Sequence, residues 1–446
     1  MTIEEIKKTW QNAGIVGAGG AGFPSYGKLN TGADTLILNC AECEPLLKLH
    51  RQLLADKSVE IISAFSEIGK ALGVKQCIIG IKSAYKSTLD AIAPIVRGYD
   101  NVTVKTLDEV YPAGDEVVLI YEVTGRVVAP GALPITQGVI VYNVETVYNA
   151  YRALHEEAPV IDKLVTVTCE VARPQTVRVP IGTAVQDVVA YCGGATVPDP
   201  VYVSGGAMMG RIVSGGDVIT KTTNAILVLP ADHRVVQQKR RNPALDARRA
   251  QSACCQCHMC SDLCPRHLLG HPIDPARFMR AVSNHSATDT EAYVQALYCS
   301  SCGLCESYSC MQGLSPRNLL AVAKQQLRKG GIKPQTLVPA PVASARNARS
   351  APVERLAARL GLGKYMRIEA PLSGDMPATR VRVPLSMHIG APSVPAVQVG
   401  DTVQKGQVIA LPANGLSVAL HAPIHGRVTA VGNEIIIAAT QRSDTK

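Results

Sequence analysis

Residues 1–150 alternate between short apolar runs and longer stretches in which apolar residues recur every three or four positions. Short apolar runs predict buried strands, here at 35–38, 77–81, 102–106 and 138–142. The helical spacing predicts helices at 1–13, 46–72 and 84–96. Strands that alternate with helices are typical of a parallel sheet with helices packed against it. We therefore expect a parallel α/β domain at 1–155.

From residue 160 onward, alternating apolar and polar residues replace the buried runs. This alternation predicts strands at 165–171, 176–179, 201–203 and 225–229, around one helix at 184–192. Mixed strands around a single helix indicate a β-grasp domain at 160–232. Its loop at 205–210 has enough glycine to approach a ligand closely. A tight structural turn with packed methionines explains the same residues, and we prefer that interpretation.

The remaining chain changes character three more times. Residues 235–332 predict a helical module, with helices at 275–283 and 316–328. Residues 333–375 are rich in Pro, Ala and Arg, which predicts a linker with a short helix at 353–360. Short strands with glycine turns follow at 376–446 and resemble the barrel-sandwich hybrid of biotinyl and lipoyl carrier domains. A carrier needs a lysine at its hairpin tip, whereas 414–417 has none, so we expect a packing or docking module. The predicted fold is multidomain α/β plus α+β.

Charge adds little to this picture. The net charge is +9 at pH 7, and basic residues gather at 239–249 and 346–359. Nucleic-acid sites interleave such cations with aromatic residues, but aromatics make up only 4% of this chain. We therefore expect no nucleic-acid partner and interpret both stretches as solvated faces, with docking of an acidic partner left open. No apolar run reaches the length that spans a bilayer, and no signal peptide opens the chain, so we expect a cytoplasmic protein that does not span a membrane.

Eight of the 14 cysteines fall into two runs with related spacing. The first, C-x2-C-x2-C-x3-C followed by Pro265, consists of Cys254, Cys257, Cys260 and Cys264. The second, C-x2-C-x2-C-x4-C, consists of Cys299, Cys302, Cys305 and Cys310. In two-cluster ferredoxins, three closely spaced thiolates bind one [4Fe–4S] cluster and the trailing thiolate binds the other. We therefore expect two [4Fe–4S] clusters, one on Cys254, Cys257, Cys260 and Cys310, the other on Cys264, Cys299, Cys302 and Cys305.

Zinc and disulfides are the alternatives for these cysteines. Zinc sites are usually built from two separated C-x2-C pairs, and disulfides require an oxidising compartment. Neither explains two triplets with a trailing cysteine. Cys255 stands outside the register of the first run. Since eight thiolates suffice for two clusters, we expect the neighbouring histidines, His258, His267 and His271, at the surface or behind the ligands.

A glycine-rich segment at 14–28, GIVGAGGAGFPSYGK, is the second candidate site. Its glycines leave the backbone unshielded, so N–H groups can approach a phosphate or a flat ring, and Lys28 can pair with a phosphate. No clear strand precedes it, so it is not the Rossmann fingerprint. Three polar motifs follow predicted strands or open helices, which is where α/β sheets bind ligands. They are NCAECEP at 39–45, YPAGDE at 111–116 and NVET at 143–146.

These four motifs occur in the same order in the flavin-binding subunit of respiratory complex I and in the C subunit of the Rnf electron-transport complex, which the chain resembles over about residues 14–150. The resemblance implies FMN and hydride transfer from NADH. It implies an FMN and nicotinamide site lined by Gly17, Gly19, Gly20, Gly22, Phe23 and Lys28. It also implies that Asn39 and Glu42 face the flavin ring, that Asp115 and Glu116 approach flavin and NADH, and that Asn143 and Thr146 hold the ribityl phosphate. Residues 160–232 resemble the soluble-ligand-binding β-grasp domain of the same family.

The domain order, with the barrel-sandwich segment last, and the stretch CCQCHMCSDLCPRHLLGHPIDP resemble the cobalamin reductases of propanediol-utilisation microcompartments over nearly the whole chain. This resemblance implies that NADH, through FMN and the clusters, reduces cob(III)alamin and cob(II)alamin toward cob(I)alamin for adenosylcobalamin regeneration. It implies an adenosyltransferase and microcompartment shell or cargo proteins as partners, and a place inside a bacterial microcompartment.

Two other functions stay open at this point. One is an Rnf-like subunit that passes electrons from NADH to a different acceptor. The other is a microcompartment electron relay without NADH oxidation. The amphipathic helix predicted at 1–13 is either an encapsulation helix or a helix that caps the α/β domain, and capping is the simpler interpretation.

Overall fold

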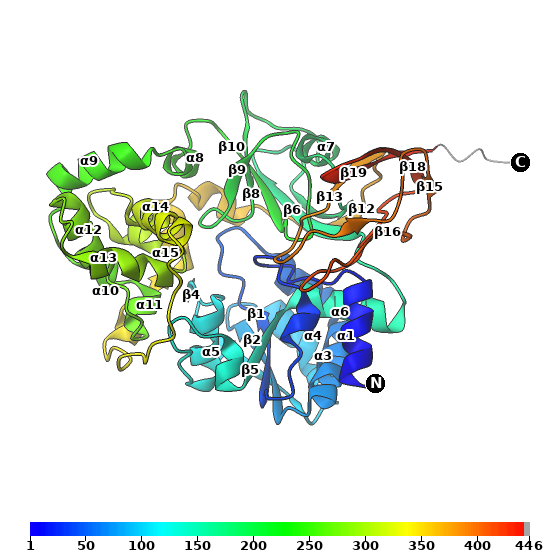
Figure 1. The fold of residues 1–446 in the computed structure, drawn as a ribbon, viewed down its shortest axis with the longest axis horizontal. Helices are drawn as coiled ribbons and strands as arrows, with labels where there is room; N and C mark the ends of the chain where they lie inside the picture. Colours follow the sequence, from blue (N-terminus) through cyan, green and yellow to red (C-terminus); the bar gives the residue numbers. More distant parts are fainter. Residues whose placement is uncertain (441–446) are drawn as a thin grey trace, which may run out of the picture.

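The structure, a computed structural model, describes residues 1–440. Figure 1 shows four parts: the α/β domain (blue to cyan) below, a second domain (green) above it, a helical domain (green to yellow) on the left and a C-terminal β domain (orange to red) on the right. Within residues 1–440, no helix is long and apolar enough to cross a membrane.

The α/β domain is built on a parallel four-stranded sheet in the order β3-β2-β1-β5. The strands are β1 (Thr35–Cys40), β2 (Gln76–Lys82), β3 (Val102–Leu107) and β5 (Val139–Asn143). The helices are α1 (Ile3–Asn12), α2 (Leu49–Asp56), α3 (Ser58–Leu72), α4 (Lys86–Val96), α5 (Glu116–Thr124) and α6 (Val144–His155). Because successive side chains of a strand face opposite sides, Leu36 and Leu38 pack against α2, α3 and α6, while Ile37 packs against α5.

Two predicted helices differ from expectation in detail. The single helix expected at 46–72 is interrupted at Lys57, whose backbone is not helical (φ −117°, ψ 39°). Apolar periodicity continues across this one-residue break and therefore does not reveal it. The helix expected at 1–13 forms as α1, and its Trp10 side chain is completely buried in an edge-to-face contact with Tyr142. The apolar face of α1 thus belongs to the core of this chain.

The second domain has a mixed six-stranded sheet in the order β12-β7-β6-β10-β8-β9. Its own strands are β6 (Asp162–Cys169), β7 (Gln175–Pro180), β8 (Val201–Ser204), β9 (Arg211–Val213) and β10 (Ala225–Leu229), with helix α7 (Val185–Tyr191) packed on one face. The edge strand β12 (Leu372–Asp375) comes from the segment expected to be a linker.

The helical domain surrounds both cysteine runs. Its helices are α8 (Arg234–Lys239), α9 (Pro243–Ala253), α10 (Met259–Asp262), α11 (Pro265–Leu268), α12 (Pro275–Ser283), α13 (Thr290–Val294) and α14 (Pro316–Lys329). α12 and α14 coincide with the two helices predicted here. A small apolar core of Phe278, Leu314 and Leu320 joins α12 to α14.

The segment 333–375 connects the helical and C-terminal domains but is not solvated along its length. Its strand β11 (Ala351–Pro352) pairs with β4 (Val110–Tyr111), and its helix α15 (Val353–Arg359) is packed into a shared core. Arg346 pairs with Glu122, and Arg349 pairs with Asp262 at 2.9 Å. The expectation of a solvated basic face is therefore wrong for Arg346, whose side chain is 13% exposed, whereas Arg349 is paired but its side chain stays 40% exposed. The sequence does not reveal these pairs, because the acidic partners lie far away along the chain.

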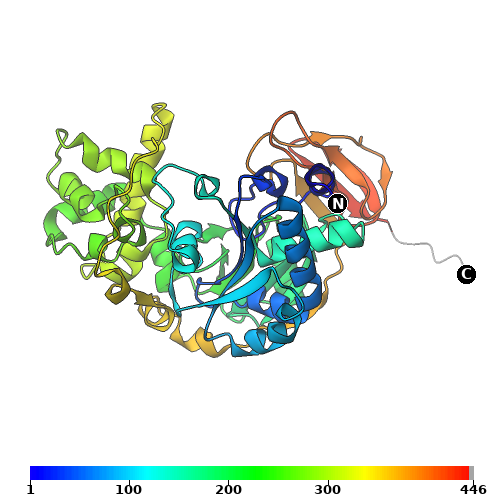
Figure 2. The same ribbon diagram turned by 90° about the horizontal axis from the view of Figure 1, so that it is seen from below.

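The C-terminal domain contains two small antiparallel sheets, β13-β19-β18-β15 and β14-β16-β17. The strands are β13 (Arg380–Pro384), β14 (Val394–Pro395), β15 (Thr402–Val403), β16 (Val408–Leu411), β17 (Leu420–His421), β18 (Gly426–Val431) and β19 (Glu434–Ala439). Figure 2 shows this domain (orange to red) on the opposite side of the molecule from the helical domain (green to yellow). Ala419 N–H donates to Gln11 O at 3.0 Å, and Ile389 N–H donates to Gly22 O at 3.1 Å. The C-terminal domain therefore contacts both the end of α1, at Gln11, and the glycine-rich segment, at Gly22.

Candidate functional site: a glycine-lined pocket and two groups of thiols

The glycine-rich segment lines a pocket at the carboxyl end of β1 and β5. The pocket has an empty volume of ≈ 1410 Å³, open to solvent. Ten of the residues singled out in the sequence line it: Gly17, Gly19, Gly20, Gly22, Phe23, Lys28, Asn39, Glu116, Asn143 and Thr146. Segments separated by well over a hundred residues therefore meet at the place where parallel sheets bind ligands.

At Gly19 and Gly22 the surrounding atoms leave no room for a side chain. A Cβ atom on Gly19 would lie 2.5 Å from Asn143 Nδ2, whereas a Cβ on Gly20 would meet no atom within 4 Å and would extend into open space. Gly22 has φ +73°, and a Cβ there would lie 3.0 Å from Met387 O of the C-terminal domain. The loop thus approaches Asn143 closely on one side and the C-terminal domain on the other, and leaves free space between them.

The N-terminus of α6 points into the same pocket. Asn143 caps this helix by accepting from Glu145 N–H at 2.9 Å, and Thr146 Oγ1 accepts from Ala18 N–H at 3.0 Å, which ties the glycine-rich loop to the helix. A helix N-terminus carries partial positive charge and favours an anion such as a phosphate.

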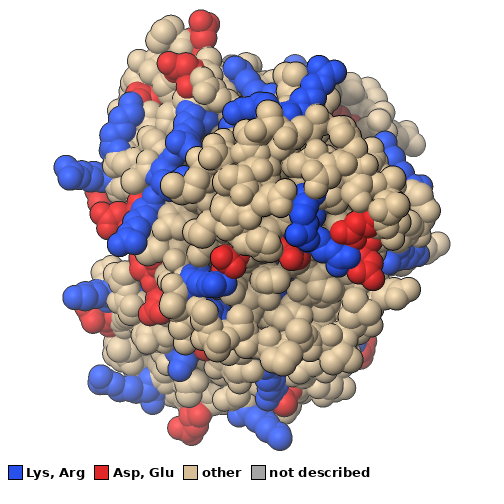
Figure 3. All heavy atoms as spheres, turned by 90° about the vertical axis from the view of Figure 1, so that its left-hand side faces the viewer, with Lys and Arg blue, Asp and Glu red and all other residues tan. Residues whose placement is uncertain are grey.

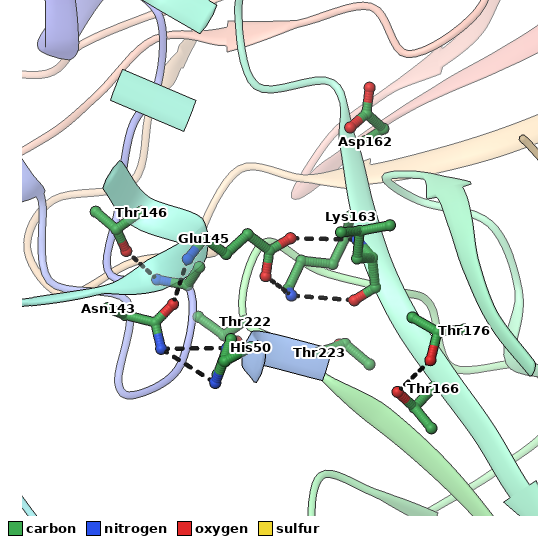
Figure 4. A network of polar contacts seen from close by, with 12 residues as sticks. His50, Asn143, Glu145, Thr146, Asp162, Lys163, Thr166, Thr176, Thr222 and Thr223 are labelled. Atoms are coloured by element: carbon green, nitrogen blue, oxygen red, sulfur yellow. Dashed lines mark hydrogen bonds and ion pairs between the residues drawn. The ribbon is translucent and has the colours of Figure 1, made fainter. Parts of the chain in front are cut away.

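A buried polar network supports this helix end (Figure 4). Asn143 Nδ2 lies 3.2 Å from His50 Nε2, and burial lowers the pKa of His50 to about 4, so its ring is neutral at pH 7. Glu145 pairs with Lys163 of β6 and accepts Leu164 N–H at 3.2 Å. The network therefore fixes α6 against the second domain while Asn143 stays at the pocket.

The opposite wall carries a cation and an acid. Lys28 Nζ lies 2.8 Å from Glu116 Oε1 and donates to Val141 O at 3.2 Å. Asn39 Nδ2 donates to Gly114 O at 3.0 Å. Ser25 Oγ is buried and has no hydrogen-bond partner within residues 1–440, although Ser25 lines the pocket. An unpaired hydroxyl, a lysine and a helix N-terminus around a roomy cavity suit a flat ligand with a phosphate, and they fit FMN.

Glu42 and Asp115 do not line the pocket. Glu42 is buried behind it, accepts His50 N–H at 3.1 Å, and burial raises its pKa. Asp115 caps α5 by accepting Val117 N–H at 3.1 Å and pairs with Arg266 of the helical domain at 2.8 Å. Because cap and arginine hold the carboxylate on the far side of the wall, the structure does not bring Asp115 to the site implied by the sequence motif.

Other lining residues were not found from the sequence. Gly27, Asn30 and Gly114 lie in or next to the sequence motifs, so the motifs could have identified them. Leu133, Pro134 and Ile135 belong to a short 3₁₀ turn that carries no motif, so only the fold places them at the pocket.

The eight cysteines of the two runs gather into two groups. Cys254, Cys257, Cys260 and Cys310 line one cavity of ≈ 420 Å³ empty volume, together with Cys255. Cys264, Cys299, Cys302 and Cys305 line a second of ≈ 330 Å³. The trailing cysteine of each run thus joins the other run's triplet, which is the grouping that the ferredoxin spacing predicts.

The loops between the cysteines have the backbone of a cluster-binding turn. Gln256, His258 and Ser301 have positive φ angles of 53°, 62° and 60°, a left-handed conformation that non-glycine residues adopt rarely. Such turns direct successive N–H groups into a concave space that favours anions. Ser301 N–H donates to Cys299 Sγ and Leu314 N–H donates to Cys310 Sγ, both at 3.3 Å. Amides directed at sulfur fit the thiolates of an iron–sulfur cluster.

The chemistry of the thiols agrees with this fit. Burial, followed by the nearby Cys310 and Cys254 thiols, raises the pKa of Cys260 to about 12. A buried thiol of this kind becomes a thiolate when a strongly positive group neutralises its charge. Within residues 1–440, no three His, Cys, Asp or Glu side chains are placed to hold a single metal ion.

Of the three nearby histidines, two are engaged by backbone oxygens. His271 Nε2 lies 3.0 Å from Val128 O, and His267 Nδ1 lies 2.8 Å from Ile273 O. His258 is exposed beside the first group of thiols.

Four family models match the chain. They are the Nuo51 FMN-binding domain at residues 10–152, the SLBB domain at 164–212, the 4Fe-4S dicluster domain at 253–315 and the RnfC barrel sandwich hybrid domain at 362–445. Fold and sites therefore define a multidomain flavin and iron–sulfur protein.

Similarity to curated proteins is more specific. The chain is 40% identical to cobalamin reductase PduS of Salmonella typhimurium, over 98% of this chain and 96% of that protein. It is 38% identical to cobalamin reductase PduS of Citrobacter freundii, over 97% and 96%. It is 32% identical to the C subunit of the Na(+)-translocating ferredoxin:NAD(+) oxidoreductase complex of Acetobacterium woodii, over 62% and 61%. The chain belongs to the family of cobalamin reductase PduS.

Proposed function

We propose that this protein is a cobalamin reductase that takes electrons from NADH through FMN and two [4Fe–4S] clusters and delivers them to corrinoid cobalt. The proposal rests on full-length similarity to proteins named cobalamin reductase PduS. One structural observation carries the proposal. The α/β domain contains the glycine-lined pocket, and the helical domain of the same chain contains two groups of four cysteines.

The electron count matches this reaction. NADH gives up a hydride, which leaves NAD⁺, one proton and two electrons for the acceptor. Reduction of Co(III) to Co(II), and then of Co(II) to Co(I), takes one electron each. FMN supplies the conversion from paired to single electrons, and iron–sulfur clusters carry single electrons.

Residues of the pocket have binding and orienting roles in this proposal. The N-terminus of α6, with Asn143 and Thr146, holds the FMN phosphate. Gly19 and Gly20 would leave the backbone open to a flat ring, and Lys28, held by Glu116 at 2.8 Å, would bind a polar group of the flavin. Glu116 is half-exposed at the mouth of the pocket and is positioned to meet NADH.

The thiols hold the clusters in the two groups described above. The proposed partners are cobalamin as substrate, an adenosyltransferase that uses the product, and microcompartment shell or cargo proteins. A place inside a bacterial microcompartment follows from the family and is part of the same proposal.

The test is anaerobic. Protein with reconstituted iron and FMN receives NADH, and the absorption spectrum of added cob(III)alamin is followed beside a Cys302→Ala variant. We expect cobalt reduction by the wild type and a large loss of rate in the variant. If NADH reduces flavin and clusters but cobalamin stays unchanged, the acceptor is wrong and the Rnf-like function, favoured by the similarity to the Acetobacterium woodii protein, replaces it. Purified protein that binds neither FMN nor NADH would instead support the relay function.

A further inference from the structure

We propose that the two clusters have a fixed order. Cys264, Cys299, Cys302 and Cys305, here called the inner group, hold the cluster nearest the flavin. Cys254, Cys257, Cys260 and Cys310, the outer group, hold the cluster that faces the acceptor. This inference rests on the proposed function and adds to it the route by which electrons enter and leave the helical domain.

Direct contacts join the inner group to the α/β domain. Tyr111 donates its hydroxyl proton to Cys302 O at 2.5 Å. Arg266, two residues after Cys264, lines the inner cavity and pairs with both oxygens of Asp115 at 2.8 and 2.9 Å.

These contacts begin at the wall of the flavin pocket. Asp115 stands between Gly114 and Glu116, and both of those residues line the pocket. One turn of chain therefore forms the wall of the flavin site on one side and, through Arg266, a contact to the inner cavity on the other.

The second domain closes the same junction. Arg317 lines the inner cavity and donates to Met208 O at 2.7 Å. Met208 N–H and Met209 N–H donate to Glu44 of the α/β domain at 2.9 and 2.7 Å. The loop at 205–210 therefore packs between three domains, next to the inner group.

The outer group has the opposite surroundings. Cys257 is exposed, whereas Cys264 and Cys305 of the inner group are buried. The outer cavity is bordered by His258 and by Met311, whose exposed fraction is 71%.

Figure 3 shows the end of the molecule formed by the helical domain, with basic residues bordering broad areas free of charged side chains. Residues 235–332 contain twelve Lys and Arg but only six Asp and Glu. An acceptor can approach the outer group without displacing any part of the α/β domain.

The shared ligand pattern makes the two groups neighbours. Cys264 follows Cys260 by four residues, yet the two thiols belong to different groups. Each transfer between the groups moves one electron and no proton, so the path needs no proton donor between them.

The order is tested by low-temperature EPR of two variants and a control. Cys302→Ala removes an inner thiol but keeps the backbone oxygen that Tyr111 contacts, and Cys257→Ala removes an outer thiol. Cys255→Ala is the matched control, because this exposed thiol lies beside the outer group but outside the ligand set. FMN and iron content, and reduction by dithionite, are measured for each protein.

We expect NADH to reduce the remaining inner cluster of Cys257→Ala. In Cys302→Ala we expect dithionite, but not NADH, to reduce the remaining outer cluster. The control should behave as the wild type. The reverse pattern, in which Cys302→Ala keeps NADH-driven cluster reduction and Cys257→Ala loses it, would overturn the order.

A second measurement needs no substitution and guards against a variant that fails to fold. In the wild type, a soluble gadolinium chelate should speed the spin relaxation of one cluster signal, that of the outer group. The photochemically generated flavin radical should couple to the other signal. Coupling of the flavin to the chelate-sensitive cluster would refute the order. A wild type that passes both tests but leaves cobalamin unreduced would refute the proposed acceptor alone.

Discussion

The ion pair between Glu145 and Lys163 joins the helix that begins at the flavin pocket to the first strand of the second domain. Both side chains are almost completely buried. Two charges removed from water are tolerated only while they neutralise each other, so removal of one leaves an uncompensated buried charge.

We therefore predict that Lys163→Met lowers the free energy of unfolding by about 3–5 kcal/mol. The double variant Glu145→Gln/Lys163→Met should recover most of this loss, because the neutral amide still accepts Leu164 N–H. Urea unfolding followed by circular dichroism measures both. If Lys163→Met unfolds at the same urea concentration as the wild type, the ion pair does not contribute to the stability of the fold.

Lys221 presents a second buried amine, and no acidic side chain within residues 1–440 pairs with it. Its Nζ donates to Gly14 O at 2.6 Å and lies 3.4 Å from Ala419 O, so it ties the glycine-rich segment to the C-terminal domain. Burial lowers its pKa from 10.5 to about 7. His388 and His421 lie near it, and burial lowers the pKa of both, to about 3 for His421, so both rings are neutral at pH 7 and above.

This shift predicts a pH dependence with a definite sign. Between about pH 7 and pH 10.5 the unfolded chain binds a proton at Lys221 that the folded chain has released. Stability from this group therefore rises with pH, by at most about 1.4 kcal/mol per pH unit. The unfolding free energy of the wild type minus that of Lys221→Met should therefore rise across that window. A difference that stays constant from pH 7 to pH 10 would contradict it.

At the scale of elements, the sequence predicts those features that depend on residues close together along the chain. The cysteine grouping follows from two local runs, and the pocket lining follows from motifs at the ends of strands. Asp115 shows the limit: the motif marks it for the flavin, but Arg266, 151 residues later, turns it toward the helical domain. The same reason explains Arg346, whose partner Glu122 comes from another domain. The interruption at Lys57 escapes prediction because one non-helical residue leaves the apolar period intact.

The glycine-rich loop is the element on which a substitution should be most informative. A Cβ at Gly19 would lie 2.5 Å from Asn143 Nδ2. Gly19→Ala should therefore push Asn143 out of its place at the helix N-terminus and weaken FMN binding. Loss of one hydrogen bond to a charged group, about 1.5–3 kcal/mol, corresponds to roughly a tenfold to hundredfold weaker affinity.

Gly363→Ala is the control for this element. No atom lies within 4 Å of a Cβ at Gly363, and its φ is not positive. Fluorescence titration of the FMN-free proteins with FMN compares the two. The steric account fails if Gly19→Ala binds FMN as tightly as Gly363→Ala.

At the scale of the whole molecule, the chain returns twice to the α/β domain after leaving it. β11 pairs with β4 directly before the segment that forms the pocket wall. Later, Ile389 donates to Gly22 O at 3.1 Å, and Ser417 N–H donates to Tyr26 Oη at 3.3 Å. The C-terminal domain therefore supports the flavin loop from outside, which gives the barrel-sandwich fold a structural use that needs no carrier lysine.

The unequal exposure of the two thiol groups predicts unequal damage by oxygen. Cys257 is exposed, while Cys264 and Cys305 are buried. In the proposed arrangement of two clusters, solvent and oxygen reach the outer cluster first, so reconstituted protein exposed to air should lose its visible absorbance in two phases. Iron analysis and EPR at the end of the fast phase should show that the outer cluster is gone and the inner one remains. In Cys257→Ala, which lacks the outer cluster, only the slow phase should appear. A single phase that destroys both clusters together in the wild type would contradict the difference in access, and an unchanged spectrum with full iron content would show that neither cluster is open to oxygen.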